Sequence, residues 1–217
     1  TIKETYDFIL NDLKESIADL PVTHGSQQGI LTQGAVYALI AEIALQGAAY
    51  IENGQEEYYS IAKKASEDLF SLNQYELDAN YEKMFNEFDY AMGSKEIILA
   101  DQRLESVFGL GVIGQMYNND DAGWSSIVPT QNLVDMYEMD NGLTKEEATG
   151  YYDAKHPFAN RDPRMDMTIL YPGQEWRGKI LNTLDEKLAD GSKNKNFPTY
   201  TDNASKTALT WAKYLDP

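Results

Sequence analysis

Asn160-Arg161-Asp162-Pro163-Arg164 lies within a series of short motifs that runs through the second half of this 217-residue chain. Asp162 can cap a helix that has Pro163 at its first position, so the stretch predicts a short helix over 164–170. The other motifs of the series are Pro129-Thr130-Gln131, 134–138, Asp140-Asn141-Gly142 and Tyr171-Pro172-Gly173. Taken by themselves, these motifs predict a connector rich in turns and aromatic residues.

Upstream of the motifs, the sequence carries the pattern of three helices. Apolar side chains recur every three or four positions from Ile2 to Leu20, and Pro21 ends that helix. Thr32 can cap a second helix, and Gly54 separates it from a third. The small residues that let a neighbouring helix approach closely are Ala35, Ala38, Ala41, Ala44 and Gly47. Two antiparallel helices of this kind resemble one tetratricopeptide-type repeat, which needs neighbours to bury its faces.

The helical periodicity fades after Leu77, and glycines become frequent from Gly109 onward. The elements predicted in this part are a short helix over 81–88, a short strand over 96–100, a short helix over 183–188 and an exposed loop over 190–203. The sequence therefore predicts a mainly α fold. A tetratricopeptide-like helical scaffold over 1–95 is expected to carry an irregular, loop-rich region over 96–217.

The composition narrows the classes of partner. Thirty-five acidic and eighteen basic residues give a formal net charge of −17, and such a surface repels phosphate backbones, so nucleic acid is not an expected partner. Solubility explains this charge better than ligand binding does. Because the chain has no cysteine, disulfides and thiolate metal sites are excluded. No run of residues approaches the apolar length that spans a bilayer.

Two enzymatic hypotheses can be tested against the sequence. The spacing of a dinucleotide-binding glycine loop occurs at 109–114, but no strand–helix–strand unit surrounds it, so a flexible glycine-rich loop is the preferred interpretation. A glycosidase would need two carboxylates at a fixed separation across one bond. The candidate acids are Asp120, Asp121, Glu138 and Asp140. Solvated surface acids are the default interpretation of all four.

Metal and cofactor sites have little support in the sequence. His24 and His156 are the only imidazoles, and neither lies at helical spacing from a second ligand. Residues 118–121 offer amide and carboxylate oxygens but lack the liganding pattern of a calcium loop. We therefore expect neither a metal nor a cofactor.

Aromatic residues beside amides and carboxylates form the strongest candidate for a binding site. A sugar ring stacks its apolar C–H face on a flat side chain, while its hydroxyl groups pair with Asn, Asp, Gln or Arg. The densest such cluster consists of Tyr117, Asn118, Asn119, Asp120 and Trp124. The weaker candidates are Tyr151, Tyr152 and Trp176, whereas Trp211 is expected to be structural. The alternative interpretation is that these rings fill small cores beneath loops.

The order of the segments resembles that of the SusD/RagB-like family of bacterial surface proteins. The resemblance covers most of 2–173, and its specific part is the Asn160–Arg164 run in this setting. The less specific matches are the helix over 35–47 and the short segments 75–77, 85, 96–98 and 213–217. Glu42 and Trp211-Ala212 depart from the family pattern.

The resemblance implies a non-catalytic, lipid-anchored protein on the extracellular face of the outer membrane. Such a protein closes over a SusC-like, TonB-dependent porin and holds an oligosaccharide or polysaccharide for import. Its glycan site is built from loop aromatics, which favours Trp124 and Tyr117 as stacking platforms, with Asn118, Asn119 and Asp120 as hydroxyl partners. Two alternatives stay open: a helical docking protein for the transporter that binds no sugar, and a glycosidase. The residues also leave open the identity of the glycan and the uptake of peptide instead.

The ends of the chain suggest a piece of a longer protein. Thr1 is not an initiator, and Asp216-Pro217 follows an aromatic segment directly. We therefore expect the N-terminal lipid anchor to lie outside this chain, as its only link to the membrane.

Overall fold

The computed structural model describes residues 1–25, 29–100, 111–200 and 203–215. The chain forms two compact units. The first contains Thr1–Ala79 and Met92–Arg103, and the second contains Asn80–Ala91 and Leu104–Pro217. The segment 80–91 therefore belongs to the second unit although residues on both sides of it belong to the first. The division between residues 95 and 96 that we expect from the sequence stays a prediction.

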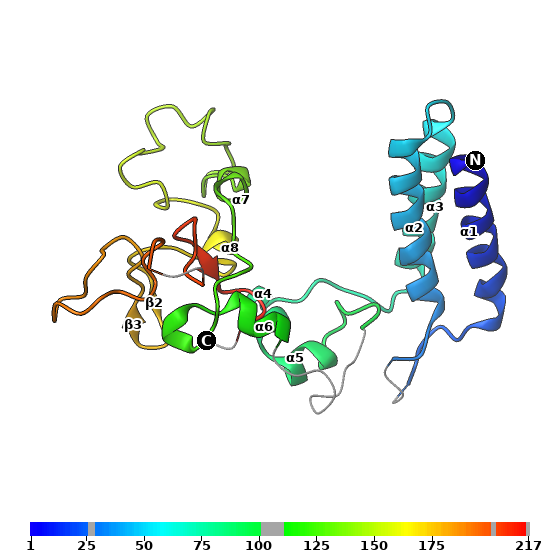
Figure 1. The fold of residues 1–217 in the computed structure, drawn as a ribbon. Helices are drawn as coiled ribbons and strands as arrows, with labels where there is room; N and C mark the ends of the chain where they lie inside the picture. The colour runs from blue at the N-terminus through cyan, green and yellow to red at the C-terminus, as the bar shows by residue number, and fades with distance from the viewer. Residues whose placement is uncertain (26–28, 101–110, 201–202, 216–217) are drawn as a thin grey trace. The chain divides into compact units, whose positions relative to one another are not determined.

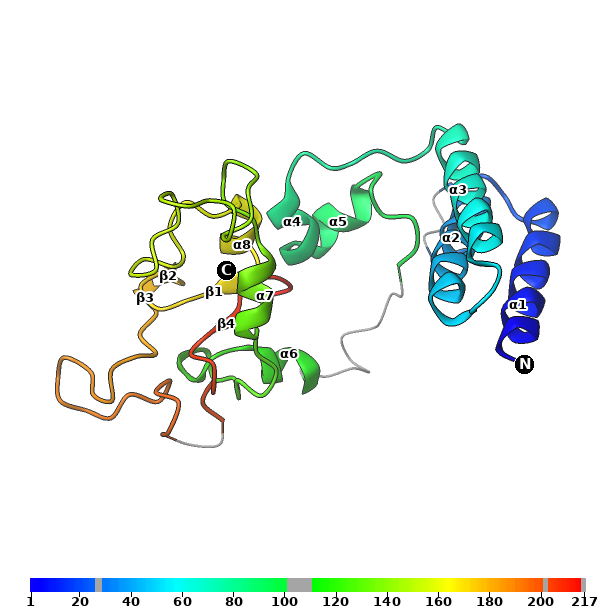
Figure 2. The same cartoon turned by 90° about the horizontal axis from the view of Figure 1, so that it is seen from above.

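The first unit is built from three long helices, which confirms the mainly α fold. These are α1 (Ile2–Ser16), continued by the short 3₁₀ helix η1 (Ile17–Asp19), then α2 (Gln33–Tyr50) and α3 (Gln55–Ser71). Helices α2 and α3 run antiparallel across a short turn and lie side by side, and α1 packs against α2 (Figures 1 and 2). Among the described residues, no helix is both long and apolar enough to cross a membrane.

Side-chain caps start the first two helices, and the Thr32 cap of α2 is the one that the sequence predicts. Thr1 accepts a hydrogen bond from the backbone N–H of Glu4, whose carboxylate returns to the Thr1 amino group in a capping box. Thr32 Oγ1 accepts from the backbone N–H of Ala35 at 3.3 Å. Gly54 precedes α3 with a φ of +122°, which few other residues adopt. The turn between α2 and α3 therefore depends on that glycine.

The core of the first unit is one cluster with Tyr58 at its centre. Tyr58 is fully buried, and a methyl group added at Gly47 would lie 2.8 Å from two of its ring carbons. The close approach of α2 and α3 thus requires a residue without a side chain on α2. The other buried members of the cluster are Leu10, Val36, Ile40, Ala44, Ala48, Ile51, Ala62 and Ala65.

Gly47→Ala should destabilise the first unit by about 1–3 kcal/mol, because the rigid ring of Tyr58 has no room to move away. Urea unfolding followed by helix ellipticity measures the loss, and hydrogen exchange should place it in α2 and α3. Gly114→Ala is the control, since a methyl group there meets no atom within 4 Å. That control should be neutral or stabilising because alanine favours a helix. Equal stability of the Gly47→Ala variant and the parent would contradict the packing argument.

The hydroxyl of Tyr58 reaches the edge of the core and donates to Asp7 Oδ1 at 2.6 Å. Burial raises the pKa of the Tyr58 phenol, and the hydrogen bond to Asp7 raises it further. The pKa of Asp7 is lowered, first by its hydrogen bond to the Lys3 ammonium and then by the bond from Tyr58. Asp7 is 41% exposed, so solvent screens much of this effect.

Tyr58→Phe should therefore cost stability in a pH-dependent way. The raised pKa of Tyr58 contributes stability below about pH 10, the ordinary value for tyrosine, and this contribution disappears at higher pH. The lowered pKa of Asp7 contributes above about pH 4 and its contribution disappears in acid. The difference in urea midpoint between parent and variant should be greatest near neutral pH and shrink on both sides. A difference that does not change with pH would refute the proposed linkage.

The second unit combines short helices with two small pairs of strands. Its helices are α4 (Tyr81–Asn86), most of α5 (Phe88–Gly93), α6 (Gly111–Met116), η2 (Asn119–Asp121), α7 (Gln131–Met136) and α8 (Pro163–Asp166). Strand β1 (Ile169–Leu170) pairs antiparallel with β4 (Thr210–Trp211), and β2 (Glu175–Trp176) pairs with β3 (Lys179–Ile180) in a hairpin. Two clusters of buried side chains hold these elements together, one around Leu170 and Leu215 and one around Val134 and Ile169.

Several expectations for this region need correction. Residues 96–100 form no strand, and 183–188 form no helix. The glycine-rich segment forms helix α6 from Gly111 instead of a flexible loop, while the start of the 109–114 motif lies outside the described residues. Helix α8 begins at Pro163 as predicted but ends at Asp166, where the chain turns into β1. These segments are too short for periodicity to be informative, and tertiary contacts decide their conformation.

Candidate functional site

The Asn160–Arg164 run builds the scaffold of the second unit. Arg161 is only 6% exposed, and its guanidinium donates to three backbone carbonyls. Nη1 reaches Pro157 O at 2.9 Å, while Nη2 reaches Val134 O at 2.6 Å and Tyr137 O at 2.7 Å. The last two carbonyls lie at the C-terminal end of α7, where helix carbonyls lack partners within the helix. Arg161 therefore closes α7 from a distant part of the chain.

The residues on either side of Arg161 complete this junction. Asn160 O accepts from the backbone N–H of Asp140 at 2.9 Å, and Asp162 N–H donates to Glu138 O at 3.0 Å. Asp162 caps α8 and pairs with the Arg164 guanidinium, which lowers the pKa of the Asp162 carboxyl. The motif at 134–142 and the motif at 160–164 are therefore two halves of one structural element.

Arg161→Gln should destabilise the protein by about 3 kcal/mol or more, because buried carbonyls would lose charged hydrogen-bond donors. Arg164→Gln is the matched control three residues away. Its guanidinium is 63% exposed, so its loss should have little effect on stability. Urea unfolding monitored by tryptophan fluorescence compares the two variants. Similar losses for both would show that the burial of Arg161 does not matter.

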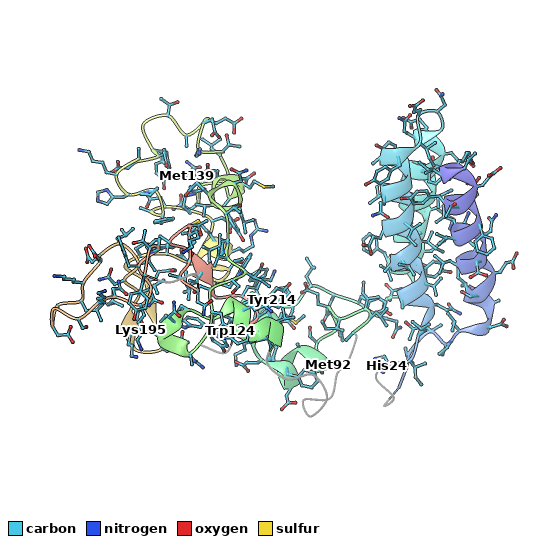
Figure 3. All side chains as sticks on the ribbon, in the orientation of Figure 1. His24, Met92, Trp124, Met139, Lys195 and Tyr214 are labelled. Atoms are coloured by element: carbon cyan, nitrogen blue, oxygen red, sulfur yellow. The ribbon has the colours of Figure 1, made fainter. Side chains whose placement is uncertain are left out.

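The candidate glycan residues lie in a loop, 117–126, that we call the Trp124 loop. It leaves α6, makes the short helix η2 and folds back along α6: Trp124 N–H donates to Gly114 O at 2.9 Å and Ser125 N–H to Tyr117 O at 3.0 Å. Gly123 is required here because a Cβ atom would lie 2.2 Å from Tyr117 O. The return of the chain leaves the Trp124 side chain 48% exposed beside the end of α6 (Figure 3).

The polar residues of the Trp124 loop hold the loop in shape. Asn118 is buried, and its Oδ1 accepts from the backbone N–H groups of Asp120 at 2.9 Å and Asp121 at 3.1 Å. Its Nδ2 donates to Asp121 Oδ2, which also accepts from Trp176 Nε1 at 2.9 Å. Asp121 is therefore not a solvated acid: only 12% of its side chain is exposed, and its carboxylate accepts hydrogen bonds within the protein.

A second loop, around Lys195 in Figure 3, supports the Trp124 loop from outside. Asn119 Nδ2 donates to Lys195 O at 2.9 Å and to Asn203 O at 3.2 Å, while Asn196 Nδ2 donates to Asp120 Oδ2 at 2.6 Å. Asn196 is itself buried at 2% exposure. The segment 190–203 is thus not simply an exposed loop. The two buried amides have different partners, because Asn194 Nδ2 donates to Asn182 O and Asp185 O shortly before this segment, whereas Asn196 reaches the Trp124 loop.

The structure places the five predicted residues in three different environments. Trp124 has an exposed ring, whereas Asn118, Asn119 and Asp120 already make hydrogen bonds within the protein. Tyr117 is half-buried, and the guanidinium carbon of Arg177 lies 5.2 Å from the centre of its ring. Sequence analysis did not single out Arg177. Its position follows from the β2–β3 hairpin, which has no clear signal in the sequence.

The weaker aromatic candidates include both buried and exposed rings. Trp176 is 9% exposed and belongs to the core around Leu170, so it is not a stacking platform. Trp211 packs against the same core, which confirms its structural role. Tyr151 is 41% exposed and its hydroxyl donates to Asp140 Oδ1 at 2.7 Å.

A further aromatic cluster surrounds Lys213 in the second unit. Its ammonium lies 3.6 Å from the centre of the Phe85 ring and donates to the Tyr81 hydroxyl at 2.9 Å. Burial raises the pKa of Tyr81, but the hydrogen bonds from Lys213 and Thr168 outweigh burial and the net shift is downward. Tyr214 N–H donates to Asn86 Oδ1 at 3.0 Å. The cluster therefore attaches α4 to the segment that follows β4.

No group of three His, Asp or Glu side chains in the described residues is placed to hold a metal ion. The oxygens of 118–121 instead accept hydrogen bonds from amides and from the Trp176 indole.

Comparison with known proteins identifies the family. The SusD family model matches residues 67–215, which is more than half of the chain. The chain therefore belongs to the SusD family. Its fold is similar to a crystal structure described as a SusD-like carbohydrate binding protein from Bacteroides fragilis, with a TM-score of 0.76 and 23% identity. The match covers 98% of this chain and 40% of that protein. No curated protein matches the sequence.

Proposed function

We propose that this chain is part of a non-catalytic glycan-binding protein. The observation that carries the proposal is the exposed Trp124 ring on a loop that internal hydrogen bonds hold in one shape. A loop that is already ordered loses little conformational freedom when a sugar binds, which favours binding. The similarity of the fold to a SusD-like carbohydrate binding protein supports the same function.

In this proposal some of the five predicted residues contact the sugar and the others hold the loop in shape. Trp124 provides the stacking face, and Asp120, exposed in the same turn, has one carboxylate oxygen that Asn196 does not engage. Asn118 and Asn119 act mainly by holding the loop, since their amides are engaged inside the protein. Tyr117 also holds the loop, because its carbonyl accepts a hydrogen bond from Ser125 N–H.

The wider role that we propose is uptake of oligosaccharides at the outer membrane. The complete protein would be lipid-anchored on the extracellular face and would deliver glycans to a SusC-like, TonB-dependent porin. Membership of the SusD family supports this role. Exposed apolar side chains on the helices, such as Phe8 at 71% and Phe70 at 74%, are compatible with docking to such a protein.

Trp124→Ala should weaken glycan binding by on the order of 1 kcal/mol or more, because one stacking platform is lost. Calorimetric titration of parent and variant against a panel of oligosaccharides measures the change. Tyr59→Ala, which removes a ring with the same exposed fraction of 48% from helix α3, is the control and should bind like the parent. Unchanged affinity of Trp124→Ala for every glycan that the parent binds would refute the site. A parent that binds no glycan but retains a porin in a pull-down would favour the docking alternative, and release of reducing ends would favour a glycosidase.

A further inference from the structure

Arg177 occupies a backbone position that disfavours its side chain. Register pairs Trp176 with Lys179, so Arg177 and Gly178 alone form the turn between β2 and β3. Their φ angles are +50° and +73°. A two-residue turn with both φ angles positive strongly prefers Asn-Gly or Gly-Gly, because longer side chains are strained there. An arginine in this strained conformation indicates that its side chain has a role there.

The Arg177 guanidinium has donors available for a ligand. Its side chain is 37% exposed, and its Nη1 lies 3.5 Å from Asp121 Oδ1, which is an ion pair without a short hydrogen bond. The other oxygen of Asp121 is engaged by Asn118 and Trp176. In the described part of the chain, no hydrogen bond donated by Arg177 is found. The planar guanidinium is therefore held in place by Asp121 and the Tyr117 ring while its donors face solvent or a ligand.

The position of Arg177 changes the chemical groups that a sugar would contact at the Trp124 loop. The guanidinium lies over the Tyr117 ring, so at this point a ligand meets a cation in place of an aromatic face. The backbone of Trp124 lies close to Tyr117, because the N–H of the next residue, Ser125, donates to the Tyr117 carbonyl at 3.0 Å. The Trp124 loop thus contributes an exposed ring, and the β2–β3 hairpin contributes, over Tyr117 of the same loop, a fork of N–H donors that matches a carboxylate.

We propose that Arg177 makes the Trp124 loop selective for acidic glycans, in which the sugars carry carboxylate groups. The inference rests on the proposed glycan-binding function and names the ligand class of the same site. Trp124 stacks on the sugar ring, and Arg177 pairs with the carboxylate.

The negative charge of the chain does not prevent this contact. The net charge of −17 is a sum over the whole chain, and at physiological salt exposed charges more than about 8 Å from the contact are largely screened. Asp121, whose Oδ1 lies 3.5 Å from Arg177 Nη1, and Asp120 in the same turn are the carboxylates of the Trp124 loop that oppose the attraction. Asp121 accepts hydrogen bonds from Asn118 and Trp176, and Asp120 accepts one from Asn196 Nδ2. A paired contact with Arg177 then decides the local preference.

The test uses three acidic oligosaccharides, made of galacturonate, mannuronate or glucuronate, each beside its carboxyl-reduced neutral counterpart. Calorimetry should show that the parent binds the acidic member of at least one pair about tenfold more tightly, as expected for a charge-assisted hydrogen bond. Arg177→Asn should abolish that preference, and because asparagine favours this turn the variant should fold at least as well as the parent. Lys155→Asn, the control, removes one charge from another exposed loop and should keep the preference.

The outcomes separate this inference from the proposed function. If no acidic member binds more tightly than its counterpart, or if Arg177→Asn keeps the preference, the role of Arg177 is overturned. Should Trp124→Ala still weaken neutral glycans in that case, the glycan-binding function stands. If Trp124→Ala leaves every affinity unchanged, the site itself fails and the selectivity proposal fails with it.

Discussion

The second unit depends on one buried cation. Arg161 is the only described side chain that donates to Pro157 O, Val134 O and Tyr137 O, and it thereby joins the end of α7 to the strand-like contact between Met139 and Arg161. A buried charge is costly unless it is well hydrogen-bonded. The three carbonyls engage both Nη atoms of Arg161, whereas its buried Nε has no partner among the described residues. That junction supports the cluster of Val134, Met165 and Ile169. The family motif is therefore conspicuous in the sequence for a structural reason, and the exposed ring of Trp124 lies elsewhere in the same unit.

In the Trp124 loop, side-chain amides satisfy backbone hydrogen-bonding groups, as the Arg161 guanidinium does at the end of α7. It has little apolar area of its own, and amide side chains replace regular secondary structure in satisfying its backbone. Asn118 caps η2 from within the loop, and Asn119 and Asn196 connect it to the segment near Lys195. A loop built in this way is rigid without being buried, which leaves Trp124 free to contact a ligand.

Sequence reasoning worked where the signal is periodic or local. The helix over Ile2–Leu20, the Thr32 cap and the Pro163 start of α8 depend on neighbouring residues, and the structure confirms them. The strand over 96–100 and the helix over 183–188 were wrong because such short segments are set by distant contacts. In the candidate site, Trp124 could be proposed from the sequence because its aromatic ring stands among amide and carboxylate residues. Arg177 could not be proposed from the sequence, because its placement depends on a hairpin of two-residue strands and on the position of the Tyr117 ring.

The assignment of residues 80–91 to the second unit has a consequence for dissecting the protein. Helix α4 is attached there through Lys213 and Asn86, although Ala79 and Met92 on either side of the segment belong to the first unit. The backbone therefore crosses between the units more than once, and no single cleavage point yields two intact halves. A fragment that starts after residue 95 would lack α4 and leave the rings around Lys213 incomplete. Separating the two units completely would require three cuts and would give four pieces, two for each unit.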